Sequence, residues 1–174
     1  MSDSPRYRVP FRRRRSGKTD FRVRLRLLKG DRPRAVVRIT RHRVLVAIAS
    51  FDPVGDRIVA SAESPELTRH GFPKAGLAST PAAYLTGYLA GLRAKARGTS
   101  AAILDTGLRH PTRGGRLLGA LKGLIDAGVE IPRGAETGLP TADRLNGKHM
   151  KHPLPEPLEM YRTRLTAEPK GASA

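Results

Sequence analysis

The fold class is decided by two neighbouring stretches, Arg34-Ala-Val-Val-Arg-Ile-Thr40 and Val44-Leu-Val-Ala-Ile-Ala49. In the first stretch, Ala35, Val37 and Ile39 alternate with residues that face the other way, which is typical of a strand with one buried face. The second stretch is apolar on both faces, as expected of a strand inside a covered sheet. Because the connection between them is tight, the two stretches predict a hairpin.

The segments that follow extend this hairpin into a larger fold. A turn leads to a third expected strand at 57–62, so the first three strands form a meander. Apolar residues at helical spacing then predict helices over 80–98 and 115–127. A short apolar run at 101–105 lies between the helices and predicts a buried strand. The order β-β-β-α-β-α predicts an α/β fold in which helices cover a mixed sheet.

The chain divides into three parts by composition. Residues 1–18 have few apolar side chains and contain Pro and Gly, so we expect an extended basic arm that cannot order itself. Residues 19–132 are expected to form the α/β core domain. Residues 133–174 are Pro-rich and show little periodicity, which predicts an irregular tail with at most a short helix over 141–146.

The segment 19–28 fits two kinds of secondary structure. Alternation of Phe21, Val23, Leu25 and Leu27 with Arg is typical of a strand. The same segment also has apolar residues at helical spacing and a basic stripe one turn apart, with Thr19 as a possible N-cap. Residue patterns alone leave helix and strand equally open.

Most of the positive charge is concentrated in the first 43 residues. They carry sixteen Lys or Arg against three acids, a balance of +13, whereas the other 131 residues contribute +5 to the total of +18. Such a local excess repels itself unless a polyanion neutralises it. Arg greatly outnumbers Lys in this region, and its planar guanidinium suits bidentate recognition of phosphate. The composition therefore predicts a nucleic-acid partner.

Several functional classes are disfavoured. The chain has no Cys, which excludes disulfides and thiolate metal sites. No stretch approaches the ~20 apolar residues that span a membrane. The histidines and acids are scattered, so we expect no catalytic site, metal or cofactor; Asp105 is expected to cap the turn after its strand. An Arg-rich start is also found in organelle transit peptides, but the dense cluster at 10–15 favours a binding arm.

A second candidate phosphate site precedes the second helix. The stretch Leu108-Arg-His-Pro-Thr-Arg-Gly-Gly-Arg116 places three Arg and a potential Thr cap at the start of that helix. Free N–H groups at a helix N-terminus bind phosphate readily. Thr112, Arg113 and Arg116 are therefore candidate RNA-binding residues, although a solvated connection would explain the same pattern.

Five ordered motifs over roughly residues 5–150 resemble one known family. They are Pro5-Arg-Tyr-Arg-Val-Pro-Phe-Arg-Arg-Arg-Arg-Ser-Gly-Lys-Thr-Asp-Phe-Arg-Val-Arg-Leu25, Phe51-Asp-Pro-Val-Gly-Asp-Arg57, Thr80-Pro-Ala-Ala-Tyr-Leu-Thr-Gly87, Asp105-Thr-Gly-Leu-Arg-His-Pro-Thr-Arg-Gly114 and Ala120-Leu-Lys-Gly-Leu-Ile-Asp-Ala-Gly-Val-Glu-Ile-Pro132. They resemble the archaeal-type 5S-rRNA-binding protein of the large ribosomal subunit, the universal family numbered eighteen in that series. Departures are mild: Phe21 stands where Tyr is expected, and Arg133 where His is usual.

The resemblance implies a three-layer α/β/α sandwich with a mixed sheet, and a helix at 19–28. It implies a non-enzymatic, cytoplasmic constituent of the large subunit that anchors 5S rRNA to the large rRNA in the central protuberance, beside a neighbouring 5S-binding ribosomal protein. The arm is expected to thread between RNA segments, with Tyr7 and Phe11 available to stack on bases. The residues expected to contact RNA in the arm, the 19–28 segment and the hairpin are Arg6, Tyr7, Arg8, Phe11, Arg12, Arg13, Arg14, Arg15, Lys18, Thr19, Arg22, Arg26, Arg38, Arg41 and Arg43.

Two other functional classes fit the basic composition. An RNA-processing enzyme with a basic docking arm predicts a cluster of catalytic side chains, which the scattered acids and histidines do not supply. An architectural DNA-binding protein predicts little discrimination between duplex DNA and structured RNA, so a competition experiment separates it from an rRNA-binding protein.

Overall fold

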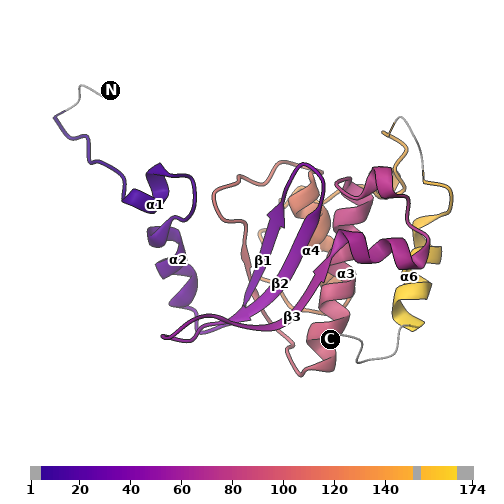
Figure 1. The fold of residues 1–174 in the computed structure, drawn as a ribbon, viewed down its shortest axis with the longest axis horizontal. Coiled ribbons are helices and arrows are strands. Elements are labelled where there is room, and N and C mark those ends of the chain that lie inside the picture. Colours follow the sequence, from indigo (N-terminus) through magenta and orange to yellow (C-terminus); the bar gives the residue numbers. More distant parts are fainter. Residues whose placement is uncertain (1–4, 151–153, 168–174) are drawn as a thin grey trace.

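A four-stranded mixed sheet forms the centre of the molecule (Figure 1). The computed structural model describes residues 5–150 and 154–167. The strand order is β3-β2-β1-β4, with the first three strands antiparallel and β4 parallel to β1. The strands are β1 (Arg34–Ile39), β2 (Val44–Ser50), β3 (Arg57–Glu63) and β4 (Ile103–Asp105). The predicted hairpin, third strand and short fourth strand are confirmed.

The two faces of the sheet differ because side chains alternate along each strand. The face that we call the inner face carries the cross-strand pair Val37–Val46, and both side chains are completely buried. The opposite, outer face carries Arg34 and Arg38 from β1 and Ala47 from β2. The hydrophobic core therefore lies on the inner side of the sheet.

Helices α3 (Thr80–Ala96) and α4 (Arg116–Asp126) cover the inner face, as the periodicity predicted. Their buried residues, among them Tyr84, Leu89 and Leu124, form one cluster with the inner side chains of the strands. Ser79 caps α3 by accepting a hydrogen bond from the Ala82 N–H at 3.3 Å. Two short 3-10 helices, η1 (Ser64–His70) and η2 (Lys74–Gly76), connect β3 to α3.

Glycines allow α3 and α4 to pack at very short distance. A Cβ atom on Gly123 would lie 2.0 Å from the Tyr84 carbonyl oxygen, and one on Gly87 would lie 2.2 Å from the Ala120 carbonyl oxygen. Such distances leave no room for any side chain. The close contact of the two helices therefore depends on glycine at both positions.

Helix α2 (Phe21–Leu28) supplies the third layer, on the outer side of the sheet. Its residues Val23, Arg24 and Leu27 line a cleft together with Arg34 and Arg38, which project from the outer face of β1. The helix that the family resemblance implied at 19–28 is confirmed, and with it the three-layer α/β architecture. Figure 1 shows α2 and α3 on opposite sides of the sheet.

The predicted N-terminal arm and C-terminal tail both need correction. The arm is not wholly extended, because Arg12–Arg15 form a helical turn, α1. In the tail, the short helix expected over 141–146 is present as α5 (Ala142–Leu145), but helix α6 (Leu158–Ala167) was not predicted. Residues 1–4, 151–153 and 168–174 lie outside the described residues. In the described part of the chain, no helix has the length and apolar character needed to cross a membrane.

Helix α6 was not predicted because the segment that contains it is rich in Pro, although its apolar residues lie at helical spacing. Leu158, Tyr161 and Leu165 are buried and join the core cluster, while the residues between them are mostly polar. Tyr161 packs edge-on against Phe72, with ring centroids 5.4 Å apart. Burial of this face against distant parts of the chain therefore stabilises this short helix.

Candidate RNA interface

The N-terminus of α2 is fixed by a carboxylate cap. Asp20 accepts hydrogen bonds from the backbone N–H groups of Arg22 at 3.0 Å and Val23 at 3.3 Å. These bonds satisfy two N–H groups that have no partner within the helix. The cap is therefore Asp20 and not Thr19, the residue that the sequence favoured. With α2 begun at this point, Arg22 and Arg26 lie one turn apart on its exposed surface.

The second half of the arm folds back onto α2. The Arg13 guanidinium donates to the Thr19 hydroxyl at 3.1 Å, and Arg14 forms an ion pair with Asp20 at 3.2 Å. The Arg22 guanidinium lies 5.4 Å from the centre of the Phe11 ring. These contacts make residues 11–18 a folded extension of α2, while residues 5–10 are exposed and form no helix or strand.

The hairpin between β1 and β2 presents a second group of basic residues. The Thr40 hydroxyl accepts from the Arg43 N–H at 3.0 Å and donates to the Arg43 carbonyl oxygen at 3.0 Å, which closes the turn. Arg41 is exposed at the tip. Arg43 forms an ion pair with Glu63 at 3.2 Å, but 58% of its side chain stays exposed. The turn geometry therefore directs both Arg side chains to solvent.

The loop between β4 and α4 contains the third group of candidate residues. Asp105 accepts from the Gly107 N–H at 2.9 Å, so the turn cap that the sequence predicted at Asp105 is confirmed. Thr112 and Arg113 are exposed. Arg116 behaves differently, because its guanidinium donates to the Ala78 carbonyl oxygen at 3.0 Å and is partly covered. Arg116 thus serves packing between α4 and the η2–α3 connection.

The topology brings these three groups to one edge of the sheet. β1 and β4 are parallel, so the hairpin after β1 and the loop after β4 leave the sheet at the same end. The cleft beneath α2 is lined by Lys18 from the arm, Arg38 from β1 and Gly107 from the loop, so the start of α2 lies at that end too. Figure 1 shows the arm, the hairpin and the loop along the upper edge of the view. We call the surface formed by the N-terminal arm, the start of α2, the hairpin between β1 and β2 and the loop after β4 the basic edge.

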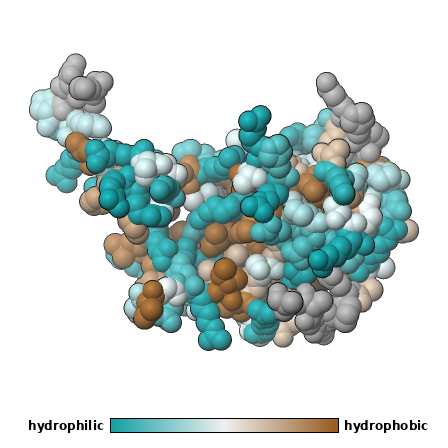
Figure 2. All heavy atoms as spheres, viewed as in Figure 1, coloured by the Kyte–Doolittle hydropathy of each residue, from teal (hydrophilic) through white to brown (hydrophobic). Residues whose placement is uncertain are grey.

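Seven candidate residues on the basic edge and on the adjoining exposed face of α2 have exposed side chains that form no hydrogen bond or ion pair within the described ranges. They are Arg8, Arg12, Arg15, Lys18, Arg26, Arg41 and Arg113. Two aromatic residues of the arm are also exposed, Tyr7 to 52% and Phe11 to 58%. Figure 2 shows hydrophobic residues scattered among hydrophilic ones on the side of the molecule that carries the arm and α2. This mixture suits a surface that contacts both phosphates and bases.

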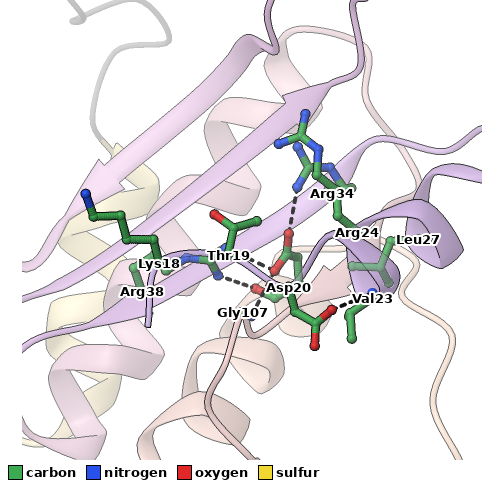
Figure 3. Close-up of a pocket in the computed structure, with 10 residues that line it drawn as sticks. Lys18, Thr19, Asp20, Val23, Arg24, Leu27, Arg34, Arg38 and Gly107 are labelled. Atoms are coloured by element: carbon green, nitrogen blue, oxygen red, sulfur yellow. Dashed lines mark hydrogen bonds and ion pairs between the residues drawn. The ribbon is translucent and has the colours of Figure 1, made fainter. Parts of the chain in front are cut away.

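An ion-pair network that the sequence did not predict lies under α2. Arg34 is 4% exposed and Asp105 is 5% exposed, and their side chains form an ion pair at 2.6 Å. Arg34 also pairs with Asp56, which in turn pairs with Arg24 of α2 at 2.8 Å. Asp105 further binds Arg38 at 3.0 Å. Figure 3 shows Arg24 and Arg34 together on one side of the cleft and Arg38 on the other.

The pKa of Asp105 reflects this environment. Burial by itself would raise the pKa of the carboxyl group, but the charge and hydrogen bond of Arg38 lower it, with further contributions from the Gly107 N–H and Arg34. The balance places the pKa below its ordinary value. Asp105 is therefore a carboxylate under physiological conditions. Together with Asp56 it faces three Arg side chains, Arg24, Arg34 and Arg38, so the network as a whole keeps one positive charge.

Comparison with known proteins agrees with this picture. A family model described as "Ribosomal large subunit proteins 60S L5, and 50S L18" matches residues 5–99. The chain is 50% identical over 150 residues to the large ribosomal subunit protein uL18 of Korarchaeum cryptofilum, a match that covers 86% of this chain and 76% of that relative. The proteins of the same name from Methanoregula boonei and Methanobrevibacter smithii are 48% and 45% identical over 86% of this chain and 85% and 77% of their own lengths. An exposed basic edge on an α/β core, a family match over more than half of the chain and these identities show that the chain belongs to this family of ribosomal large-subunit proteins.

Proposed function

We propose that this chain binds 5S rRNA in the large subunit of the cytoplasmic ribosome. It helps anchor the 5S rRNA to the large rRNA in the central protuberance. As a member of a ribosomal protein family the chain has a structural role, not an enzymatic one. It works beside a neighbouring 5S-binding ribosomal protein. The observation that carries the proposal is the basic edge, where three segments distant in sequence present exposed Arg and Lys side chains together.

The basic edge suits folded RNA better than a uniform duplex. Arg side chains extend from a thin arm, a helix face, a hairpin tip and a loop, so the surface is irregular and does not follow a single groove. Structured RNA is recognised by shape, with phosphate contacts that position the protein and aromatic residues that stack on unpaired bases. Phosphate neutralisation supplies most of the affinity and makes it depend on salt.

The proposal is tested by competition binding with the full chain. We expect labelled 5S rRNA to be bound at physiological salt, with an affinity that falls linearly on a log–log plot against salt concentration. Unlabelled 5S rRNA should compete strongly and duplex DNA of similar length weakly. Equal competition by duplex DNA would contradict the proposal and favour an architectural DNA-binding protein.

A second measurement uses cell lysate fractionated by size. The chain is expected to migrate with the large subunit and to be recovered with 5S rRNA. Recovery as a free protein, with no rRNA, would count against both the 5S rRNA and the anchoring role.

A further inference from the structure

The ion-pair network beneath α2 joins the elements of the basic edge to one another. Through Asp56, it ties Arg24 on α2 to Arg34 on β1, and through Asp105 it ties Arg34 to Arg38. Asp105 also holds the first turn of the loop after β4 through the Gly107 N–H. The helix, the strand that leads to the hairpin and the loop are thus connected by two carboxylates.

Helix α2 has few other contacts that fix its position. None of its residues is buried, and Phe21 and Leu25 are 48% and 59% exposed. Just beyond its C-terminal end, Gly30 packs against the Ile103 side chain of β4, and a Cβ atom on Gly30 would lie 2.8 Å from the Ile103 Cδ1 atom. The ion pair between Arg24 and Asp56 is therefore the main polar contact that fixes the rotation of α2 relative to the sheet.

The charge of the two acids works against RNA binding. A carboxylate beside a surface that neutralises phosphates lowers the affinity for RNA through simple repulsion. Removing one of them should therefore strengthen RNA binding if charge alone decided the outcome. Geometry predicts the opposite, because the acid holds the helix that carries Arg22 and Arg26. The two effects have opposite signs, so an experiment separates them.

We propose that Asp56 is a positioning residue for RNA binding: by joining Arg24 to Arg34 it holds α2 in the orientation that presents Arg22 and Arg26 to the RNA. The inference rests on the proposed 5S rRNA binding. Asp56 lies in the connection between β2 and β3 and is not part of the hydrophobic core cluster, and Arg34 keeps its ion pair with Asp105 when Asp56 is replaced. Its substitution is therefore expected to leave the fold intact.

Asp31 offers a matched control for Asp56. It is an exposed acid just beyond α2, and its side chain has no hydrogen bond or ion pair with any described residue. Its φ angle of 46° is one that Asn adopts readily, so Asp31→Asn changes the charge without straining the backbone. Asp31→Asn and Asp56→Asn change the net charge equally, and they differ in whether an ion pair of α2 is broken.

The first measurement is 5S rRNA affinity over a series of salt concentrations. Asp56→Asn is expected to weaken 5S rRNA binding about tenfold. The slope of log affinity against log salt should become shallower by about one to two, which corresponds to the loss of one or two phosphate contacts, because Arg22 and Arg26 no longer face the RNA. Asp31→Asn is expected to bind as the wild type does, or slightly more tightly. Equal or tighter binding by Asp56→Asn would overturn the proposal.

The second measurement follows α2 without RNA. The chain has no Cys, so spin labels placed by Leu25→Cys on α2 and Ala96→Cys at the end of α3 report a single distance. Asp56→Asn is expected to broaden or shift the distance distribution, whereas Asp31→Asn leaves it unchanged. An unchanged distribution in Asp56→Asn would overturn the positioning role even if RNA binding were weaker.

A third variant covers the case in which Asp56→Asn fails to fold. Arg24→Gln breaks the same contact from the side of α2 and leaves the Asp56–Arg34 pair in place, so it should broaden the same distance. If it does not, the proposal is overturned. Failure of the wild type to bind 5S rRNA would contradict the proposed function, while the spin-label distances would still test the role of Asp56 in holding α2.

Discussion

At the scale of single residues, the Arg side chains of this protein fall into two groups that the sequence does not distinguish. Arg41 is exposed at the hairpin tip, whereas Arg116 donates to the Ala78 carbonyl oxygen and is partly covered. Arg34 is buried and paired with Asp105. The guanidinium group supports the structure at Arg34 and Arg116, and we propose that it contacts phosphate at Arg41; its surroundings decide which.

This difference predicts opposite outcomes for two alanine substitutions. Arg41→Ala should reduce the salt slope of 5S rRNA binding by about one, because one phosphate contact is lost. The same substitution should change the free energy of unfolding by less than ~0.5 kcal/mol. Arg116→Ala should lower the free energy of unfolding by about 1 kcal/mol through the lost hydrogen bond and leave the salt slope unchanged. RNA binding in a salt series and urea unfolding measure both, and the reverse pattern would refute the assignment.

Asp105 predicts a specific loss of stability in acid. Its pKa is lower in the folded protein than in the unfolded chain, where it takes its ordinary value of about 4, so the stabilisation is complete above that value. It is lost as the pH falls below about 4 towards the folded-state pKa, because the unfolded chain binds the proton first. Unfolding free energies measured from pH 5 to pH 2 should fall less steeply for Asp105→Asn than for the wild type. Equal slopes would contradict the prediction.

At the scale of elements, the α3–α4 contact depends on close approach of two backbones. Gly→Ala inside a helix normally adds ~1 kcal/mol of stability through helix propensity. At Gly123 the sign reverses, since the new Cβ atom would meet the Tyr84 carbonyl oxygen at 2.0 Å and force the helices apart.

Gly123→Ala should therefore lower the free energy of unfolding by about 1–3 kcal/mol, the usual range for overpacking. Gly134→Ala is the control, because a Cβ atom there meets nothing within 4 Å and its backbone needs no glycine. Thermal unfolding followed by circular dichroism compares the two variants with the wild type. A stable Gly123→Ala protein would show that α3 and α4 separate at little cost.

At the scale of the whole molecule, the protein consists of a packed core and a basic arm that touches it through α2. The hydrogen bonds, ion pair and ring contacts that residues 11–18 make with other described residues are to residues 19–22, at the start of α2, and Lys18 also lines the cleft beneath α2. None of residues 11–22 belongs to the core cluster, so we expect the core to fold without the arm. We propose that the arm and the core contribute differently to RNA binding: the arm supplies charge and reach, and the core supplies the fixed geometry of the hairpin and the loop.

Deletion of residues 1–18 should therefore leave the core folded and weaken 5S rRNA binding. The circular dichroism spectrum and the unfolding midpoint are expected to stay close to those of the full chain, while both the affinity and the salt slope fall, because all Arg side chains of the arm are removed. Unchanged binding at physiological salt would contradict the role of the arm.

The sequence by itself determined the strands, the two core helices and the preference for a polyanionic partner, because these depend on local features: alternation, helical spacing and charge density. It did not determine helix α6 or the roles of individual Arg residues. Those depend on which side chains meet across the fold: Tyr161 on Phe72, Arg24 on Asp56, Arg34 on Asp105. Only the tertiary structure decided that the hairpin, the loop and the start of α2 share one edge, because parallel pairing of β1 and β4 brings together segments that are far apart in the chain.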